Sequence, residues 1–172
     1  MGYFLNSLSA AGVASMVMFG TTAQADLRVS FDEGAPKDRF RIENTGACAM
    51  SDLSLLVDLA PSQGGLIFDV TSEGQGVEVF QPFEIVQGAE ALDGVPKVTD
   101  GQTEISLDIV NLAPNEAIAF TIDVDDTLGQ RAITVSGAEI QGAVVSYVHV
   151  GDQKSATFST NAEAKISGTS CS

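Results

Sequence analysis

Apolar side chains recur at every second position along much of this chain, and this period restricts the fold more than any other feature. It is clearest in residues 118–124, where Ile118, Phe120, Ile122 and Val124 alternate with smaller or polar residues. Successive side chains of a strand point to opposite faces, so such a run predicts a strand with one face in a core. The same period occurs in runs that begin at Leu27, Phe40, Leu53, Leu66 and Ile105.

Turn-forming residues separate these runs at short intervals, for example at residues 33–36, 44–46, 61–65 and 113–115. No window has a good helical period with capping residues, and residues 86–92 have room for one helical turn. Residues 144–166 are typical of a final hairpin that turns near Gly151. The sequence therefore predicts an all-β fold, a two-sheet antiparallel sandwich, immunoglobulin-like or Calx-beta-like, with about nine or ten strands.

The first 25 residues have the features of a secretory signal. Residues 8–19 are apolar, and Ala23-Gln24-Ala25 matches the small-x-small pattern before a cleavage site. The apolar run is shorter than the roughly 20 residues of a membrane span. We expect a signal peptide over residues 1–25 and one domain over residues 26–172, exported to the periplasm or outside the cell. Residues 1–25 contain no Lys or Arg, so an uncut N-terminal anchor is the alternative.

The net charge of −15 restricts the partners of the chain. An acidic surface repels nucleic acid and anionic membranes, so neither is expected to bind. Such a surface keeps a protein soluble in salt, and it also attracts divalent cations.

The two cysteines, Cys48 and Cys171, are far apart in a chain that is expected to leave the cytosol. An oxidising compartment favours a disulfide between them, which would tie the C-terminal tail to the domain. Two free thiols, or a bond to another chain, are the alternatives.

Motifs for catalysis are missing from the sequence. His149 is the single histidine and lies in an alternating run, which favours a structural residue over a catalytic base. The chain has no Gly-x-Ser-x-Gly motif, and its cysteines lack the short spacing of a zinc or redox site. Carboxylate pairs of the kind that hydrolyse sugars leave no local pattern. We expect a protein without enzymatic activity.

The most concentrated polar feature is the acidic segment 123–129. Asp123 and Asp125 project from the outward face of the strand expected there, and Asp126 begins the turn. Several carboxylate oxygens within a few residues suit Ca²⁺, so Asp123, Asp125 and Asp126 are the predicted ligands. The segment does not match an EF-hand loop. The alternative is a solvated acidic strand end whose oxygens satisfy turn amides.

Two aromatic residues, Phe80 and Phe83, lie on either side of Pro82. Proline does not join a central ladder, so this segment is expected at a sheet edge or a bend. Exposed aromatic side chains there would form a partner-binding edge, and the alternative is that both are part of the core.

The sequence resembles a group of small exported proteins of marine alphaproteobacteria that are described as aggregation-factor core proteins. The resemblance rests on GAPKDRF at 34–40, IENTGAC at 42–48, GVEVFQPF at 76–83 and FTIDVDDTLG at 120–129. It implies calcium-dependent adhesion through a sandwich similar to Calx-beta modules. The segment LAPNE at 112–116 also resembles the Leu-x-Pro-Gly-Glu turn of bacterial immunoglobulin-like adhesion modules. Asn115 replaces the glycine, which suits a positive φ.

Three functions are consistent with these features. The first is a non-enzymatic binding or adhesion module that engages a cell-surface polymer or a protein partner with the help of calcium. The second is a structural matrix protein that self-associates through sheet edges. The third is a polysaccharide-acting enzyme on a sandwich scaffold.

Overall fold

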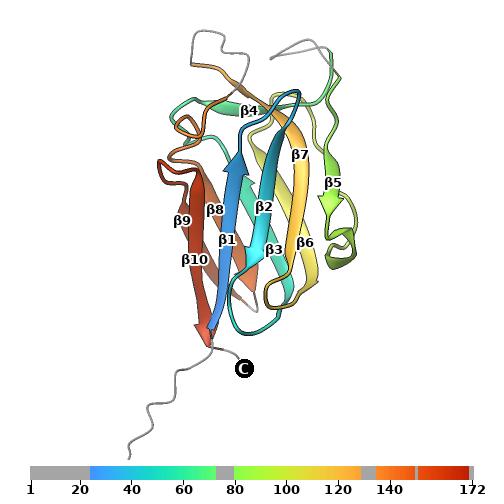
Figure 1. Ribbon diagram of the computed structural model, residues 1–172, viewed down its shortest axis with the longest axis vertical. Coiled ribbons are helices and arrows are strands. Elements are labelled where there is room, and N and C mark those ends of the chain that lie inside the picture. The colour runs from blue at the N-terminus through green and yellow to red at the C-terminus, as the bar shows by residue number, and fades with distance from the viewer. Residues whose placement is uncertain (1–23, 73–79, 129–134, 150, 171–172) are drawn as a thin grey trace, which may run out of the picture.

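A computed structural model describes residues 24–72, 80–128, 135–149 and 151–170 of the chain. These residues form ten strands and one short 3₁₀ turn (Figure 1). Their bounds are β1 Gln24–Asp32, β2 Asp38–Asn44, β3 Met50–Asp58, β4 Leu66–Asp69, β5 Glu84–Gln87, η1 Ala89–Ala91, β6 Glu104–Leu112, β7 Ala117–Asp126, β8 Val144–His149, β9 Asp152–Thr157 and β10 Glu163–Ser170.

The strands build two antiparallel sheets. The first sheet has the order β10-β1-β2-β7-β4, and β5 also pairs with β7. The second sheet has the order β6-β3-β8-β9. In Figure 1 the first sheet faces the viewer and the second lies behind it. The predicted all-β, two-sheet sandwich is therefore confirmed, and so is the helical turn within residues 86–92. The final hairpin predicted over residues 144–166 is confirmed only for β8 and β9, which end at Thr157. Residues 163–166 belong instead to β10, which crosses to the first sheet and pairs with β1.

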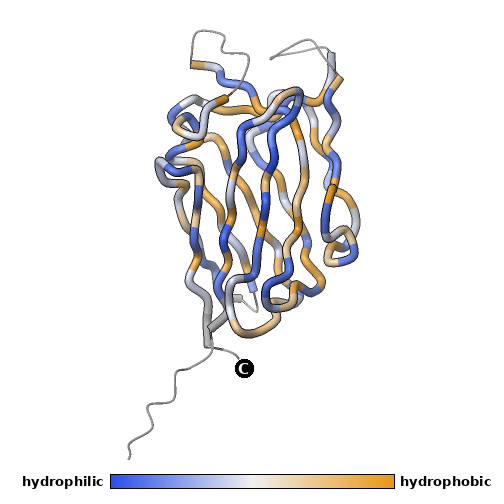
Figure 2. The backbone as a smooth tube through the Cα atoms, viewed as in Figure 1, coloured by the Kyte–Doolittle hydropathy of each residue, from blue (hydrophilic) through white to orange (hydrophobic). Residues whose placement is uncertain are grey.

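The core lies between the two sheets, as the alternation predicts. Along β6 the inward residues Ile105, Leu107 and Ile109 are each 1% exposed, whereas their neighbours are exposed. Figure 2 shows this alternation as apolar and polar stretches that follow one another along the strands. Burying such a side chain stabilises the fold by about 1.5–3 kcal/mol.

An aromatic cluster fills the core beneath β2, β4 and β7. The ring of Phe40 lies 5.0 Å from those of Phe31 and Phe120 and 6.2 Å from that of Phe68, measured between ring centroids. Phe40, Phe68 and Phe120 are completely buried. Because these rings fix three strands against one another, they provide a firm base for side chains on the outer face of the same strands.

The turn between β6 and β7 follows the prediction from the LAPNE segment. Asn115 has a φ of 65°, in the left-handed region that asparagine tolerates better than most residues. Its backbone N–H donates to the carbonyl oxygen of Asn44, at a distance of 2.8 Å. The β6–β7 turn is thereby tied to the end of β2.

Two of the predictions involve the ends of the chain, which lie partly outside the described residues. Most of the predicted signal peptide lies outside them, and cleavage after Ala25 would remove only the first two residues of β1. None of the described residues belongs to a helix that is long and apolar enough to cross a membrane.

Cys48 does not carry a free thiol. Cys171 lies outside the described residues, so the bond between the two cysteines stays a prediction. Ser170, the last residue of β10, pairs with Gln24, the first residue of β1. Also in β1, the carbonyl oxygen of Asp26 accepts a hydrogen bond from the backbone N–H of Thr45, in the loop that contains Cys48.

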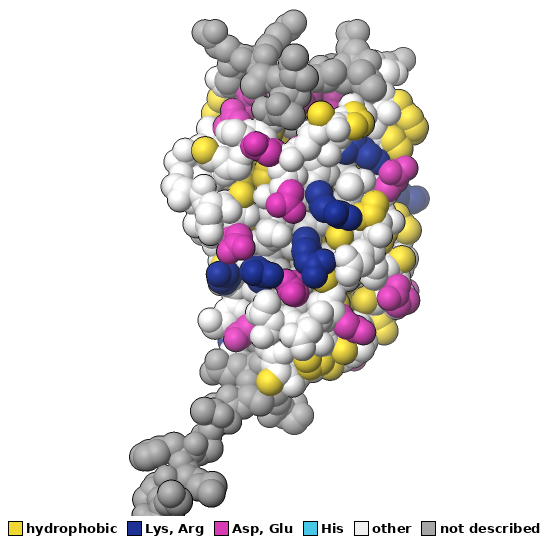
Figure 3. Space-filling view, in the orientation of Figure 1, with side chains coloured by type: hydrophobic (Ala, Val, Ile, Leu, Met, Phe, Trp, Pro, Cys, Tyr) yellow, Lys and Arg dark blue, Asp and Glu magenta, His cyan; other side chains and the backbone are white. Residues whose placement is uncertain are grey.

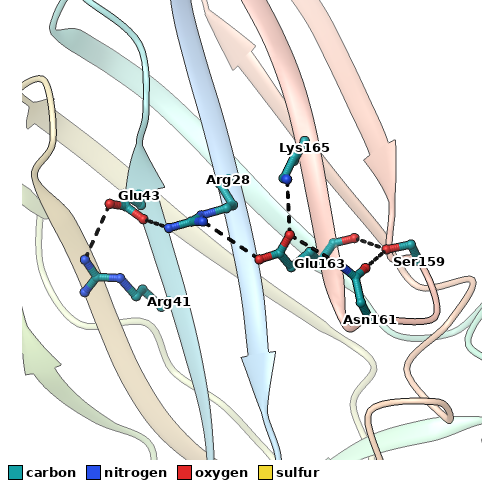
Figure 4. Close-up of polar contacts among 7 residues, drawn as sticks. All are labelled: Arg28, Arg41, Glu43, Ser159, Asn161, Glu163 and Lys165. Carbon is teal, nitrogen blue, oxygen red and sulfur yellow. Dashed lines mark hydrogen bonds and ion pairs between the residues drawn. The ribbon is translucent and has the colours of Figure 1, made fainter.

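Basic and acidic side chains alternate across the outer face of the first sheet (Figure 3). Arg28 forms ion pairs with Glu43 and Glu163, and these carboxylates also pair with Arg41 and Lys165 (Figure 4). Ion pairs that remain accessible to solvent contribute at most about 1 kcal/mol each. The positive charges of Arg28, Arg41 and Lys165 are thus balanced by glutamates on the same face of the sheet.

Candidate metal centre

Three aspartates from two neighbouring strands converge at one end of the first sheet. The antiparallel register places Asp69 of β4 directly opposite Asp123 of β7, and Ile67 opposite Asp125. Residues that face each other across an antiparallel pair project from the same side, so all three carboxylates lie on the outer side of β7. In Figure 1 this is the upper end of the sandwich, where β4 meets the end of β7.

The spacing of the carboxylates suits a single cation. One carboxylate oxygen from each of Asp69, Asp123 and Asp125 lies within 4.8 Å of the other two. Oxygens bind Ca²⁺ at about 2.3–2.6 Å, so two oxygens on opposite sides of one ion are separated by about 4.6–5.2 Å. Three oxygens this close together could ligate one Ca²⁺ ion.

Asp69 is the most unusual of the three side chains. It is 1% exposed, and neither of its carboxylate oxygens has a hydrogen-bond partner among the described residues. Burial and repulsion from Asp125 and Asp100 together raise the pKa of Asp69 to about 6. A buried, unpaired carboxylate is costly, and it normally takes a proton, a hydrogen-bond donor or a metal ion.

Asp123, on the neighbouring strand β7, is also surrounded by carboxylates and partly buried. Burial, followed by repulsion from Asp125, Asp38 and Asp69, raises the pKa of Asp123 to about 7. Like charges directly across a strand pair are destabilising, and the Asp69–Asp123 pair is such a case. The site therefore attracts positive charge from solution.

Asp100 supports the strand end that carries Asp69. Its Oδ1 accepts hydrogen bonds from the backbone N–H groups of Val70 and Thr71, each at 2.9 Å, and its other oxygen accepts from the Thr71 hydroxyl. These bonds lower the pKa of Asp100. The residues that directly follow Asp69 are thus held by a neighbouring carboxylate.

The structure brings two of the three predicted ligands into one group and leaves the third outside it. Asp123 and Asp125 lie together on the outer face, but Asp126 is not in the group that could hold one ion. Asp126 lies opposite Leu66 at the far end of β4, whereas Asp69 supplies the third carboxylate. The signal for Asp69 in the sequence is a carboxylate within the apolar run LIFDV at 66–70.

The two aromatic residues of the predicted partner-binding edge have different environments. Phe80 is 68% exposed, whereas the ring of Phe83 packs 4.9 Å from that of Phe120 at the margin of the core. Only Phe80 therefore presents its ring to solvent. His149 is the last residue of β8, lies opposite Asp152 of β9 and does not belong to the group of three aspartates.

Comparisons of the chain with models of protein families, with curated proteins and with solved structures found no match. The resemblance to aggregation-factor core proteins therefore stays a prediction. The case for a function rests on the geometry of the three aspartates.

Proposed function

We propose that this protein is an exported, non-enzymatic binding module that holds Ca²⁺ with Asp69, Asp123 and Asp125. The ion orders this end of the sandwich for contact with a cell-surface polymer or a protein partner. The observation that carries the proposal is the buried carboxylate of Asp69, which has no hydrogen-bond partner among the described residues and faces two further carboxylates.

The chemistry of the donors favours calcium over transition metals. All three donors are carboxylates, which are hard oxygen ligands, and no histidine or cysteine belongs to the group. Ca²⁺ takes six to eight oxygen ligands in a flexible geometry, so water or partner oxygens complete its coordination. Asp123 and Asp125 are only half-buried, which leaves the ion open to such ligands on their side.

The proposed role in adhesion follows from where the ion would lie. It would join the short β4 to β7 across a pair of opposed aspartates, and so stabilise one end of the sandwich. A site of this kind makes partner binding depend on calcium, because the end of the sandwich is strained by charge repulsion without the ion.

The first test is calorimetric titration of the purified protein with CaCl₂. We expect binding with the wild-type protein and a loss of affinity of more than about 100-fold with Asp69→Asn, because that substitution removes the buried ligand. Asp126→Asn is the matched control, since it removes the same charge from the neighbouring strand β7, outside the group. It should bind calcium within about threefold of wild type.

The stability of the metal-free protein provides a second readout. In EDTA at pH 7, Asp69→Asn should raise the free energy of unfolding by about 1–2 kcal/mol, because it removes a buried negative charge. Added calcium should stabilise the wild-type protein but not this variant. Equal behaviour of wild type and Asp69→Asn in both experiments would mean that the carboxylates are a solvated strand end.

The partner is tested separately. Immobilised bacterial cell-surface polysaccharides should retain the wild-type protein in calcium and release it in EDTA. Retention that is the same in calcium and in EDTA would contradict a calcium-dependent function and leave the metal site to be judged by the titration alone.

A further inference from the structure

A second buried carboxylate, that of Asp38, lies close enough to repel Asp123 and Asp125 without belonging to the proposed ion site. Asp38 is 2% exposed and is the first residue of β2. Its Oδ2 accepts a hydrogen bond from the backbone N–H of Val124, at 3.1 Å, and its Oδ1 accepts one from Gly34, at 2.9 Å. One side chain thus joins the β1–β2 turn to the middle of the segment that carries Asp123 and Asp125.

The register explains why a side chain is needed at this point. The ladder between β2 and β7 ends where Asp38, the first residue of β2, pairs with Ile122. If the ladder continued, Pro36 would lie opposite Val124, but the chain has already turned away between β1 and β2. The carboxylate of Asp38 therefore takes the place of a backbone acceptor for the Val124 N–H.

Val124 lies between two of the proposed ligands, and its side chain is buried in the core. A hydrogen bond to its amide consequently restrains the backbone that presents Asp123 and Asp125. Groups that orient metal ligands in this way typically change metal affinity by about 10- to 100-fold when they are mutated.

We propose that Asp38 is a positioning residue that couples the calcium site to the β1–β2 turn, residues 33–37. Asp38 does not bind the ion; it holds the ligand-bearing segment of β7 and the amide of Gly34 in one arrangement. Calcium binding therefore orders the turn. Because such coupling is reciprocal, an ordered turn also strengthens calcium binding. This inference rests on the proposed calcium function.

The test combines calorimetry with NMR of the purified protein. Asp38→Asn keeps the size of the side chain but places an amide group against one of the two N–H donors. We expect it to weaken calcium binding by about 10- to 100-fold. In the wild-type protein, calcium should shift the backbone amide resonance of Gly34 and slow its hydrogen exchange. In Asp38→Asn, saturating calcium should leave the Gly34 amide unchanged.

A matched control separates positioning from the simple loss of a nearby negative charge. Glu33→Gln removes a charge that also repels Asp38, and the glutamine oxygen can still accept the Gly137 N–H, which Glu33 accepts at 3.0 Å. Glu33→Gln should alter calcium affinity by less than about threefold, since an exposed charge is well screened.

The outcomes are distinguishable. If Glu33→Gln weakens binding as much as Asp38→Asn, charge rather than position accounts for the effect and the inference is wrong. The inference is also wrong if calcium changes neither the Gly34 amide resonance nor its hydrogen exchange in the wild-type protein. This result does not depend on the folding of any variant. If the wild-type protein shows no calcium binding at all, the proposed function fails and the coupling falls with it.

Discussion

At the scale of single residues, Asn44 holds the end of the sandwich opposite to the aspartates. Its side chain is completely buried, and its Nδ2 donates to the carbonyl oxygens of Cys48 and Leu112, both at 2.8 Å. Its Oδ1 accepts from the backbone N–H of Gly46, at 3.0 Å. A single amide therefore satisfies three backbone groups, two in the loop between β2 and β3 and one at the end of β6, which an apolar side chain cannot do.

Replacing this residue should be strongly destabilising. We expect Asn44→Ala to lower the free energy of unfolding by about 2–4 kcal/mol, because it leaves buried backbone groups without partners. Urea denaturation followed by circular dichroism measures the change. Asn111→Ala is the control: Asn111 is exposed on β6 and accepts one hydrogen bond, from the Ser51 hydroxyl. It should change stability by less than about 0.5 kcal/mol, and equal losses in the two variants would contradict the role of Asn44.

At the scale of elements, the passage from β5 into η1 depends on a close approach of two backbones. Gly88 has a φ of 71°, and a Cβ atom there would lie 2.5 Å from the carbonyl oxygen of Ala117. Gly94 also has a positive φ, 88°, but a Cβ atom there would meet nothing within 4 Å. The two glycines thus share the backbone strain that a side chain would cause, and they differ in the available space.

This difference gives a paired prediction. Gly94→Ala should destabilise the fold by about 1–2 kcal/mol, the cost of a left-handed conformation for a residue with a Cβ atom. Gly88→Ala should destabilise it by about 3–5 kcal/mol, because the clash with Ala117 must also push β5 away from β7. Midpoints and slopes of urea denaturation measure both values. A Gly88→Ala loss no larger than that of Gly94→Ala would show that β5 moves freely on β7.

At the scale of the whole molecule, the buried aspartates at the end of the sandwich formed by β4 and β7 should make the metal-free protein less stable as the pH rises. The pKa values of Asp38 and Asp69 are raised to about 6 and that of Asp123 to about 7, chiefly by burial. The folded protein therefore binds more protons than the unfolded chain between pH 4 and pH 7. Stability consequently decreases as the pH rises through this range, because proton binding favours the folded state.

Thermal unfolding at several pH values tests this sign. In EDTA, the free energy of unfolding should be higher at pH 5 than at pH 7.5, by about 1–3 kcal/mol. With saturating calcium the trend should reverse, because protons then compete with the ion for the same carboxylates. Metal-free protein that becomes more stable from pH 5 to pH 7.5 would show that the carboxylates are well solvated.

The sequence by itself determined the class of fold and the position of most strands, because alternation and turn residues are local properties. The runs at 118–124 and 105–109 became β7 and β6, and Asn115 adopts the positive φ that its place in LAPNE predicted. The same local pattern was sufficient to place Asp123 and Asp125 on one outward face.

Only the tertiary structure decided which other carboxylates join them. Asp69 faces Asp123 because β4, which is more than 50 residues earlier in the chain, pairs with β7 in one particular register. A shift of that register would change the partner of Asp123, and no local pattern encodes it. Asp38 reaches Val124 for the same reason, since the β1–β2 turn leaves the ladder there. The strands follow from periodicity, whereas the site follows from pairing between distant segments.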